Sequence, residues 1–596
     1  MTPQVDGGRF PVKRIVGETV TVEADLFADG HDPVRGVLRV RHGSDRDWTE
    51  IPLRPLENDR WTGSFTVSKV GYYAYQILGW VGEERSFRGR RPRNPTRSVV
   101  SNEVRDLALF KNEISRHVVA RDDGFETYPK EFRLRVDREK ARFSAWYELF
   151  PRSCSPHPGK HGTFKDLEGW LPTIAGMGFD VLYLPPIHPI ARAKRKGKNN
   201  ALEAGPQDPG SPWAIGSPEG GHKHIHPELG TPADFRRLVA AAREAGLEVA
   251  LDIALQCSPD HPYVKQHPQW FRRRPDGSIQ HAENPPKKYE DILPFDFETR
   301  QWKALWEEMK SIFLFWADQG VRLFRVDNPH TKPFDFWEWL IAEVQKKHPD
   351  ALFLSEAFTR PKVMLLLAKL GFSQSYTYFC WKNTRWELTD YFTELTRPPM
   401  SEFFRPSLWP NTPDILTAYL QEGGPGAFRA RLILAATLGA SYGIYGPAFE
   451  LCENAPREPG SEEYLNSEKY ELKAWETGRP DGLKELITRI NRIRRENPAL
   501  QWNGGLEFHP VDNDRLLCYS KSSPDGANRL LVVVNLDPKH AQAGTVDLPP
   551  ERLGFTSPSF AVEDLLSGSS YSWHGSRHYI ELNPAQAPAH LFRVRA

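Results

Sequence analysis

Hydrophobic and polar residues alternate along the first hundred residues, in segments bounded by glycine, proline and aspartate. The clearest of these segments read ETVTVEADLFAD and DRWTGSFTVSKVGYYAYQILGWV. A period of two residues is typical of strands with one buried face and one face in solvent. We therefore expect an N-terminal, immunoglobulin-like β-sandwich over residues 1–105.

From about residue 141, short apolar segments alternate with longer helical ones. The apolar segments lie at 143–150, 181–187, 247–253, 321–327, 351–357, 373–379, 413–416 and 441–445. Such alternation predicts a parallel sheet with helices outside it, and eight units predict a (β/α)8 TIM barrel of the α/β class over 141–500. An open doubly wound sheet is the alternative, but no G-x-G-x-x-G follows the first strand to support it.

Two further regions complete the predicted organisation. Residues 106–140 are charged and mixed, which indicates a linker with some helix. Beyond 500 the β pattern returns in DRLLCYS, RLLVVVNLD, HYIELNP and HLFRVRA, which predicts a second β-sandwich over 501–596. A chain of this length is too long for one hydrophobic core, so several domains are expected.

Charge and composition exclude several classes of function. A net charge of +1 argues against a dedicated nucleic-acid or membrane-surface binder. No apolar run is long enough to span a bilayer, and MTPQVDGGRFPVKR lacks the apolar core of a secretory signal. The five cysteines are scattered without metal-ligand spacing, which fits free thiols in a reducing cytoplasm. We therefore expect a cytoplasmic protein.

Three acidic residues fall at or near predicted strand ends. Asp327 closes VRLFRVD, Glu356 closes FLSE and Asp414 lies in NTPD. The carboxyl ends of barrel strands carry the active residues of TIM-barrel enzymes, although an aspartate after a strand also commonly caps the next helix. Arg325 is two residues before Asp327, so both side chains point to the same face, where the arginine would keep the carboxylate ionised.

Paired carboxylates at neighbouring strand ends suit glycosyl transfer. Retaining enzymes hold the nucleophile and the acid/base roughly 5–5.5 Å apart. Neighbouring strands lie about 4.8 Å apart, so adjacent strands ending in aspartate and glutamate could provide that spacing.

The motifs at these positions resemble a known superfamily. GVRLFRVDNPH (320–330), FLSEA (353–357), NTPD (411–414) and LDIAL (251–255) resemble the conserved motifs of the α-amylase superfamily. Longer strings are similar to the bacterial α-1,4-glucan:maltose-1-phosphate maltosyltransferases (GlgE). They include AWYELFPRS, LPPIHPI, RKGKNN, WAIGSPEGGH, ENPPKKYEDI, FRVDNPHTKPFDFWEW and NTPDILTAYLQ.

The resemblance implies an activity and a role for each carboxylate. The family is a group of retaining glycosyltransferases that move maltosyl units from maltose 1-phosphate to the non-reducing end of an α-1,4-glucan, in glycogen biosynthesis. It implies that Asp327 is the nucleophile and Glu356 the general acid/base, that Asp414 stabilises the distorted sugar and that Arg325 orients the nucleophile.

The resemblance also implies substrate contacts and no cofactor. The residues expected near the donor phosphate are Asn284, Lys287, Tyr289 and Asn328, and those expected near the maltosyl group are Lys196, Gln256, Lys469 and Tyr470. Without the family, the lysine pair in ENPPKKYED is more often solvated surface. Amylase hydrolases carry an Asn-His pair after the third-strand aspartate, whereas Gln256 and Cys257 follow Asp252 here, so we expect no metal.

Oligomeric state and the rival functions stay open at this point. Better-known members form homodimers with the help of a helical bundle, for which the region 105–140 is too short. The rivals are an α-glucan hydrolase or transglycosylase, a trehalose- or sucrose-type isomerase or phosphorylase, and a non-catalytic glycan-binding barrel. The last would usually lack a catalytic carboxylate, and all three are present.

Overall fold

A computed structural model describes residues 1–596 except 32, 82–99, 102–125, 128–129, 285–286 and 596. The chain forms two compact units, residues 1–141 with 398–404, and residues 142–397 with 405–596. Much of the predicted linker at 106–140 lies outside the described residues.

The first unit contains two sheets. One has the order β1-β10-β7-β3-β4, with β9 beside β7, and the other has the order β5-β6-β2-β8. Alternate residues of β2 are buried, as the period of two predicts. The strands are β1 (Val12–Ile15), β2 (Thr19–Phe27), β3 (Val34–His42), β4 (Thr49–Pro52), β5 (Arg54–Pro55), β6 (Arg60–Thr66), β7 (Gly71–Val81), β8 (Val100–Ser101), β9 (Glu126–Thr127) and β10 (Phe132–Asp137).

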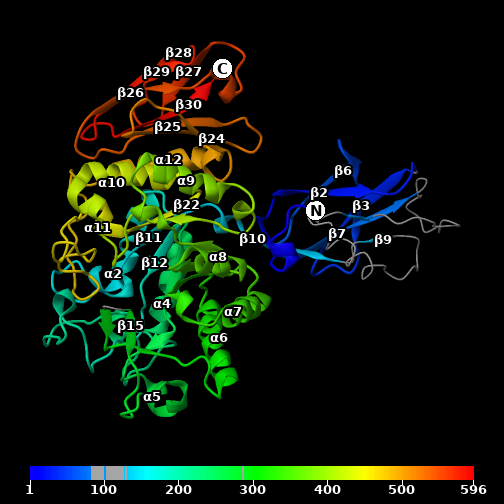
Figure 1. Cartoon of the computed structure of the whole chain (residues 1–596). Helices are drawn as coiled ribbons and strands as arrows, with labels where there is room; N and C mark the ends of the chain where they lie inside the picture. The colour runs from blue at the N-terminus through cyan, green and yellow to red at the C-terminus, as the bar shows by residue number, and fades with distance from the viewer. Residues whose placement is uncertain (32, 82–99, 102–125, 128–129, 285–286, 596) are drawn as a thin grey trace. The chain divides into compact units, whose positions relative to one another are not determined.

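An eight-stranded parallel sheet forms the centre of the second unit (Figure 1). Its strand order is β20-β19-β18-β13-β12-β11-β22-β21, and a parallel bridge between Ser375 and Pro406 joins its two edges. The strands are β11 (Ser144–Glu148), β12 (Val181–Leu184), β13 (Glu248–Ile253), β18 (Leu323–Asp327), β19 (Leu352–Glu356), β20 (Gln374–Ser375), β21 (Ser407–Leu408) and β22 (Ser441–Tyr445). The predicted TIM barrel is confirmed.

Helices follow the strands and cover the barrel (Figure 1). In α6 the buried residues Leu305, Met309, Ile312 and Trp316 recur every three to four positions, which gives the helix one face against the sheet. The helices are α2 (Phe164–Glu168), α3 (Leu171–Gly176), α4 (Pro232–Glu244), α5 (Pro262–Gln266), α6 (Trp302–Asp318), α7 (Phe334–Lys347), α8 (Pro361–Lys369), α9 (Arg385–Thr396), α10 (Ala418–Leu438), α11 (Gly446–Glu450) and α12 (Lys484–Glu496).

The position of the seventh strand corrects the sequence prediction. The sequence predicts this strand at 413–416, but the structure has it at Ser407–Leu408. Thr412 and Ile415 instead form a bridge within a turn, in which Asp414 donates its N–H to Thr412 Oγ1 at 3.3 Å. The apolar residues Ile415 and Leu416 are buried all the same, and a short buried segment has the same composition whether it is a strand or a loop.

Two further sheets, β23-β24-β25-β30-β27-β28 and β26-β29, form the C-terminal part of the second unit. They enclose their own apolar core, which includes Leu531, Val533 and Leu582. This part contacts the barrel through a 2.6 Å hydrogen bond between Thr437 of α10 and Tyr519 of β24. The strands are β23 (Leu506–His509), β24 (Leu516–Ser522), β25 (Arg529–Asn535), β26 (Gln542–Asp547), β27 (Ser559–Asp564), β28 (Ser570–His574), β29 (Arg577–Leu582) and β30 (Ala589–Arg595).

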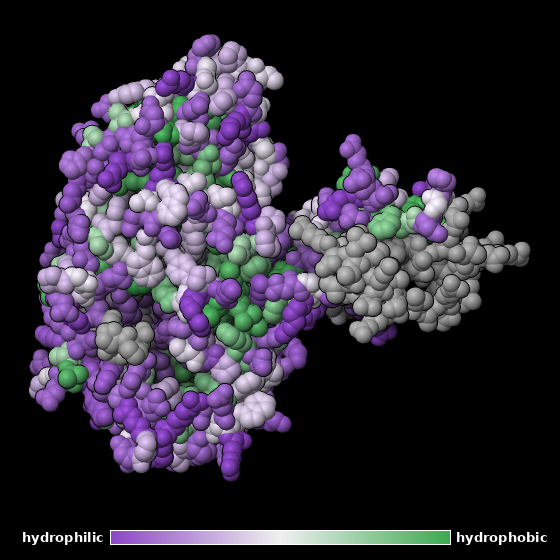
Figure 2. Space-filling model, in the orientation of Figure 1, coloured by the Kyte–Doolittle hydropathy of each residue, from purple (hydrophilic) through white to green (hydrophobic). Residues whose placement is uncertain are grey.

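Polar residues dominate the face of the molecule that Figure 2 shows, with apolar residues in scattered patches. None of the helices in the described part of the chain combines the length and the apolar character that a bilayer crossing requires.

Close packing at β22 gives a first prediction about stability. A Cβ atom added at Gly443 would lie 2.3 Å from the Trp409 ring, which stacks on Tyr376 at 5.0 Å between centroids. Gly443→Ala should therefore lower the free energy of unfolding of the barrel by about 1–3 kcal/mol, measured by urea unfolding. Gly176→Ala is the matched control, since nothing lies within 4 Å of its added Cβ, and an equal loss there would refute the packing argument.

Candidate active site

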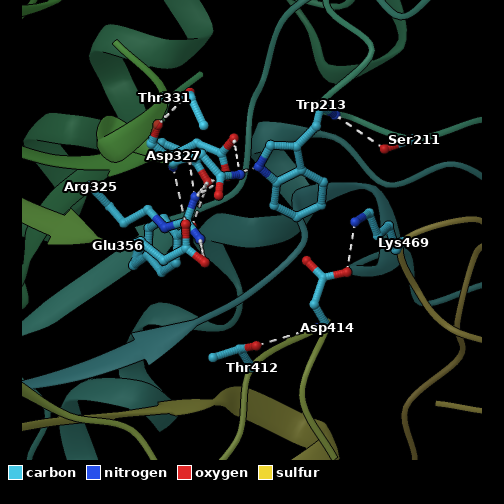
Figure 3. Close-up of polar contacts among 12 residues, drawn as sticks. Ser211, Trp213, Arg325, Asp327, Thr331, Glu356, Thr412, Asp414 and Lys469 are labelled. Atoms are coloured by element: carbon cyan, nitrogen blue, oxygen red, sulfur yellow. Dashed lines mark hydrogen bonds and ion pairs between the residues drawn. The ribbon is translucent and has the colours of Figure 1, made fainter. Parts of the chain in front are cut away.

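Two carboxylates at the ends of neighbouring barrel strands form the centre of the site. Asp327 ends β18 and Glu356 ends β19, and the two residues are direct partners in the parallel ladder. The guanidinium of Arg325 reaches both, with Nη1 2.8 Å from Asp327 Oδ1 and Nη2 3.5 Å from Glu356 Oε1 (Figure 3). The structure thus brings together these three residues that the sequence selects.

Asn328 connects the same two carboxylates from the loop that follows. Its main-chain N–H donates to Glu356 Oε2 at 3.1 Å, and its side-chain Nδ2 donates to Asp327 Oδ2 at 3.1 Å. It does so in the left-handed conformation, with φ 43° and ψ 53°, which is uncommon for a residue with a side chain but best tolerated by asparagine and aspartate. The strained turn therefore fixes the geometry of the carboxylate pair.

The surroundings give the carboxyl groups of Asp327 and Glu356 different pKa values. Burial raises the pKa of Asp327, but the positive charges of Arg325 and Lys332 outweigh this effect and hold it below its ordinary value. Burial raises the pKa of Glu356 to about 7, against the lowering effect of Arg325 and with the charge of Asp327 adding to the rise. At neutral pH Asp327 is therefore ionised, whereas Glu356 is partly protonated.

Asp252 joins this network, although the sequence did not select it as a functional residue. It lies on β13, and its carboxylate accepts from Arg325 Nη1 at 3.0 Å, from the Tyr183 hydroxyl at 2.6 Å and from Trp213 Nε1 at 3.1 Å. Burial raises its pKa to about 6. Its position at the end of an apolar strand, in LDIAL, was the signal that could have identified it.

Asp414, the third predicted carboxylate, lies apart from the first two. Lys469 Nζ forms a 2.6 Å ion pair with Asp414 Oδ1, and the same ammonium lies 5.0 Å from the centroid of the Trp213 ring. Figure 3 shows this ion pair and the Asp327–Glu356 pair on either side of Trp213. The indole of Trp213, which donates to Asp252, therefore connects the two halves of the site.

The segment that carries Lys469 and Tyr470 is anchored by residues that the sequence did not single out. Glu468, itself buried, accepts from the Tyr445 hydroxyl at 2.6 Å and from Trp475 Nε1 at 3.1 Å. Its main-chain oxygen accepts from the buried guanidinium of Arg152 at 2.6 Å. Tyr470 is 5% exposed, and its ring lies 5.9 Å from the Lys469 ammonium.

Lys196 and the predicted phosphate-contacting segment also lie close together. Lys196 is buried, and its ammonium donates to Glu290 Oε2 at 2.7 Å. Glu290 is the residue that follows Tyr289 in the sequence. The strands β15 (Ala282–Asn284) and β16 (Lys287–Tyr289) form an antiparallel hairpin in which Asn284 pairs with Lys287. Its tip, residues 285–286, lies outside the described residues.

Gln256 starts the short strand β14 (Gln256–Cys257), which pairs with β17 (Leu293–Pro294). Its side chain is half-buried. The pairing ties the loop after β13, which contains Gln256, to the chain that follows the β15–β16 hairpin.

Histidines in the described part of the chain offer one group of potential metal ligands. The ligand atoms of His161, His226 and Glu228 lie within 4.8 Å of one another. However, His226 Nδ1 already accepts the Glu228 N–H at 3.3 Å, and the buried guanidinium of Arg152 lines the same cavity. The positive charge of the arginine disfavours a bound cation there. We therefore interpret this group as a cap of the loop and not as a metal site.

Solved structures with the same architecture include α-amylases. The chain aligns with an α-amylase from Lactobacillus plantarum at a TM-score of 0.57 and 21% identity, over 76% of this chain and 100% of that one. An α-amylase from Geobacillus thermoleovorans aligns at 0.59 and 15% identity, over 76% and 98%. The chain therefore shares the (β/α)8 TIM-barrel fold of these α-amylases.

Sequence relatives narrow the assignment to one family. An α-1,4-glucan:maltose-1-phosphate maltosyltransferase from Methylacidiphilum infernorum is 51% identical over 99% of this chain and 94% of its own length. One from Streptomyces coelicolor is 46% identical over 99% and 94%. Family models for domain N/S and for the C-terminal domain of this enzyme match residues 1–109 and 508–594. The chain belongs to the α-1,4-glucan:maltose-1-phosphate maltosyltransferase family.

Proposed function

We propose that this chain transfers maltosyl units from maltose 1-phosphate to the non-reducing end of an α-1,4-glucan, releases phosphate and so extends the polymer in glycogen biosynthesis. Family membership supports this activity. The observation that carries the chemistry is the pair Asp327 and Glu356, in register at adjacent strand ends and bridged by Arg325.

The proposed mechanism is double displacement with retention, and the ionisation of the pair supports the two roles. Asp327 attacks the anomeric carbon of the donor while Glu356 gives its proton to the departing phosphate oxygen, which leaves a β-maltosyl ester on Asp327. Glu356, now ionised, then takes the proton of the acceptor 4-hydroxyl as that oxygen attacks the same carbon. The two inversions restore the α configuration, and phosphate can return by the reverse path.

The residues proposed to contact the substrate lie in segments that follow barrel strands. Lys196, Gln256, Lys469 and Tyr470 are proposed to bind the maltosyl group, and Asp414 to stabilise its distorted ring. Asn284, Lys287, Tyr289 and Asn328 are proposed to bind the donor phosphate, since lysine charge and amide N–H groups suit a phosphate. The ion pairs Lys196–Glu290 and Lys469–Asp414 support this placement, because they hold both lysines in fixed positions.

A single assay tests the proposed activity. The purified protein is incubated with maltose 1-phosphate and a maltooligosaccharide, and phosphate release and product length are followed together. We expect phosphate release and products that grow by two glucose units. Shortened oligosaccharides without phosphate dependence would instead indicate an α-glucan hydrolase with the same carboxylates.

The pH dependence of the reaction provides a further prediction. Glu356 must be protonated to assist phosphate departure, and its pKa is about 7. We therefore expect kcat/KM for maltose 1-phosphate to fall about tenfold per pH unit above roughly pH 7. The donor phosphate also titrates in this range, so α-maltosyl fluoride is the control. Its leaving group needs little acid assistance, and an equally steep fall with the fluoride would contradict the assignment of Glu356.

Three sequence predictions accompany this function. They are a homodimer, left open because the region 105–140 is too short for the helical bundle, a cytoplasmic location, and the division into 1–105, 106–140, 141–500 and 501–596. The family models at 1–109 and 508–594 support the outer two parts of that division. Sedimentation of the purified chain tests the homodimer.

A further inference from the structure

Lys332 is a buried cation beside the catalytic pair that the mechanism above does not use. It follows the short helical turn Pro329–Thr331 and is 8% exposed. Its ammonium contacts two main-chain oxygens, that of Asn328 at 3.1 Å and that of Asp327 at 3.4 Å. Among the described residues, no carboxylate lies within ion-pair distance of it.

The contacts of Lys332 converge on the strained turn. The main-chain oxygen of Asn328 also accepts from Thr331 Oγ1 at 2.8 Å and from the Thr331 N–H at 3.2 Å. Three donors therefore hold one peptide group in a left-handed conformation that is disfavoured on its own. That same residue touches both Asp327 and Glu356, so looseness in the turn would reach both carboxylates.

The position of the charge is costly unless anions offset it. An ammonium loses its hydration on burial, and this one also lies just before the N-terminus of α7, whose dipole repels cations. The titratable and charged groups that face it are Asp327, Glu356, Asp252, Arg325 and His330. Burial lowers the pKa of Lys332 to about 8, and the charges of Asp327 and Glu356 work against that fall, so the group stays mostly charged at neutral pH.

We propose that Lys332 is a positioning residue for the transfer reaction, with two effects. It secures the left-handed turn at Asn328, and its buried charge keeps Asp327 ionised for attack. The inference rests on the proposed function, in which Asp327 is the nucleophile. In the described part of the chain, the hydrogen bonds of the Lys332 ammonium go to the main-chain oxygens of Asp327 and Asn328, so it acts through these two residues.

Two variants separate the effect of the charge from that of the hydrogen bond. Lys332→Gln removes the charge but keeps an N–H donor, and Thr331→Val removes one hydrogen bond to the Asn328 oxygen without changing any charge. The measurement is kcat/KM for α-maltosyl fluoride against pH, over the range in which circular dichroism shows an intact fold. The fluoride is chosen because its departure requires no proton from Glu356.

Removal of a neighbouring cation destabilises the carboxylate, so the pKa of Asp327 rises in Lys332→Gln. We expect the fall in rate at low pH to move about one pH unit upward in that variant, and to stay in place in Thr331→Val, which only turns over more slowly. Lys332→Arg, which restores a cation, should keep the wild-type profile. A Lys332→Gln profile that matches the wild type, or an equal shift in Thr331→Val, would overturn the proposal.

The fluoride also separates this proposal from the proposed function. If the wild-type protein consumes α-maltosyl fluoride but not maltose 1-phosphate, the natural donor is wrong while the profiles of the variants still decide the role of Lys332. If the wild-type protein uses both donors but the pH profiles of Lys332→Gln and the wild type coincide, maltose 1-phosphate is supported as the donor and the proposed role of Lys332 is refuted.

Discussion

Asp327→Ala should abolish maltosyl transfer, with a loss in kcat on the order of 10⁵-fold or more. Without this carboxylate no covalent intermediate can form, and losses of about this size follow when a covalent nucleophile is removed from an enzyme. Donor binding should survive, because the proposed phosphate and maltosyl contacts lie on other residues. Phosphate release gives the rate, and titration calorimetry with maltose 1-phosphate gives the affinity.

The stereochemistry of a rescue reaction sharpens this test. Removal of the Asp327 side chain leaves space on the β face of the sugar, where azide can attack α-maltosyl fluoride directly and yield β-maltosyl azide. The matched control is Asp335→Ala, the same change at an exposed aspartate in the first turn of α7, which should leave the rate unchanged. A near-normal rate in Asp327→Ala would refute the assignment of Asp327 as the nucleophile.

The barrel could be predicted because its strands are short, apolar and separated by amphipathic helices, as in the segment from α6 to β18. The seventh strand could not be placed by the same signal. Ile415 and Leu416 are buried without being a strand, and the true strand Ser407–Leu408 is only two residues long. Hydropathy reports burial, and burial alone does not decide whether the backbone pairs.

The residues of the candidate site also differ in whether the sequence could predict them. Asp327, Glu356 and Arg325 could be predicted because their distance from a strand end and their spacing of two residues fix which way they point. Residues brought in by loops could not be ranked in this way. Glu468 is far along the chain from the nearest barrel strand, and Lys332 lies in the loop after β18. Only the fold shows that each of them is buried against the site.

Glu356→Gln should lower kcat for maltose 1-phosphate by about 10²- to 10⁴-fold, the usual range for loss of a general acid/base. The amide keeps the shape of the side chain but cannot donate the proton that the departing phosphate needs. With α-maltosyl fluoride the first step requires little acid, so Asp327 should still become maltosylated. The second step then lacks its base, and the maltosyl-enzyme should accumulate and be visible by mass spectrometry as one added maltosyl unit.

Azide distinguishes this variant from Asp327→Ala through the anomer that forms. In Glu356→Gln azide needs no base, attacks the maltosyl-enzyme from the α face and should give α-maltosyl azide, the opposite anomer to that expected without the nucleophile. The two products follow from which carboxylate remains, because Asp327 covers the β face in one variant and is absent in the other. The β anomer from Glu356→Gln, or the α anomer from Asp327→Ala, would reverse the roles assigned to the pair.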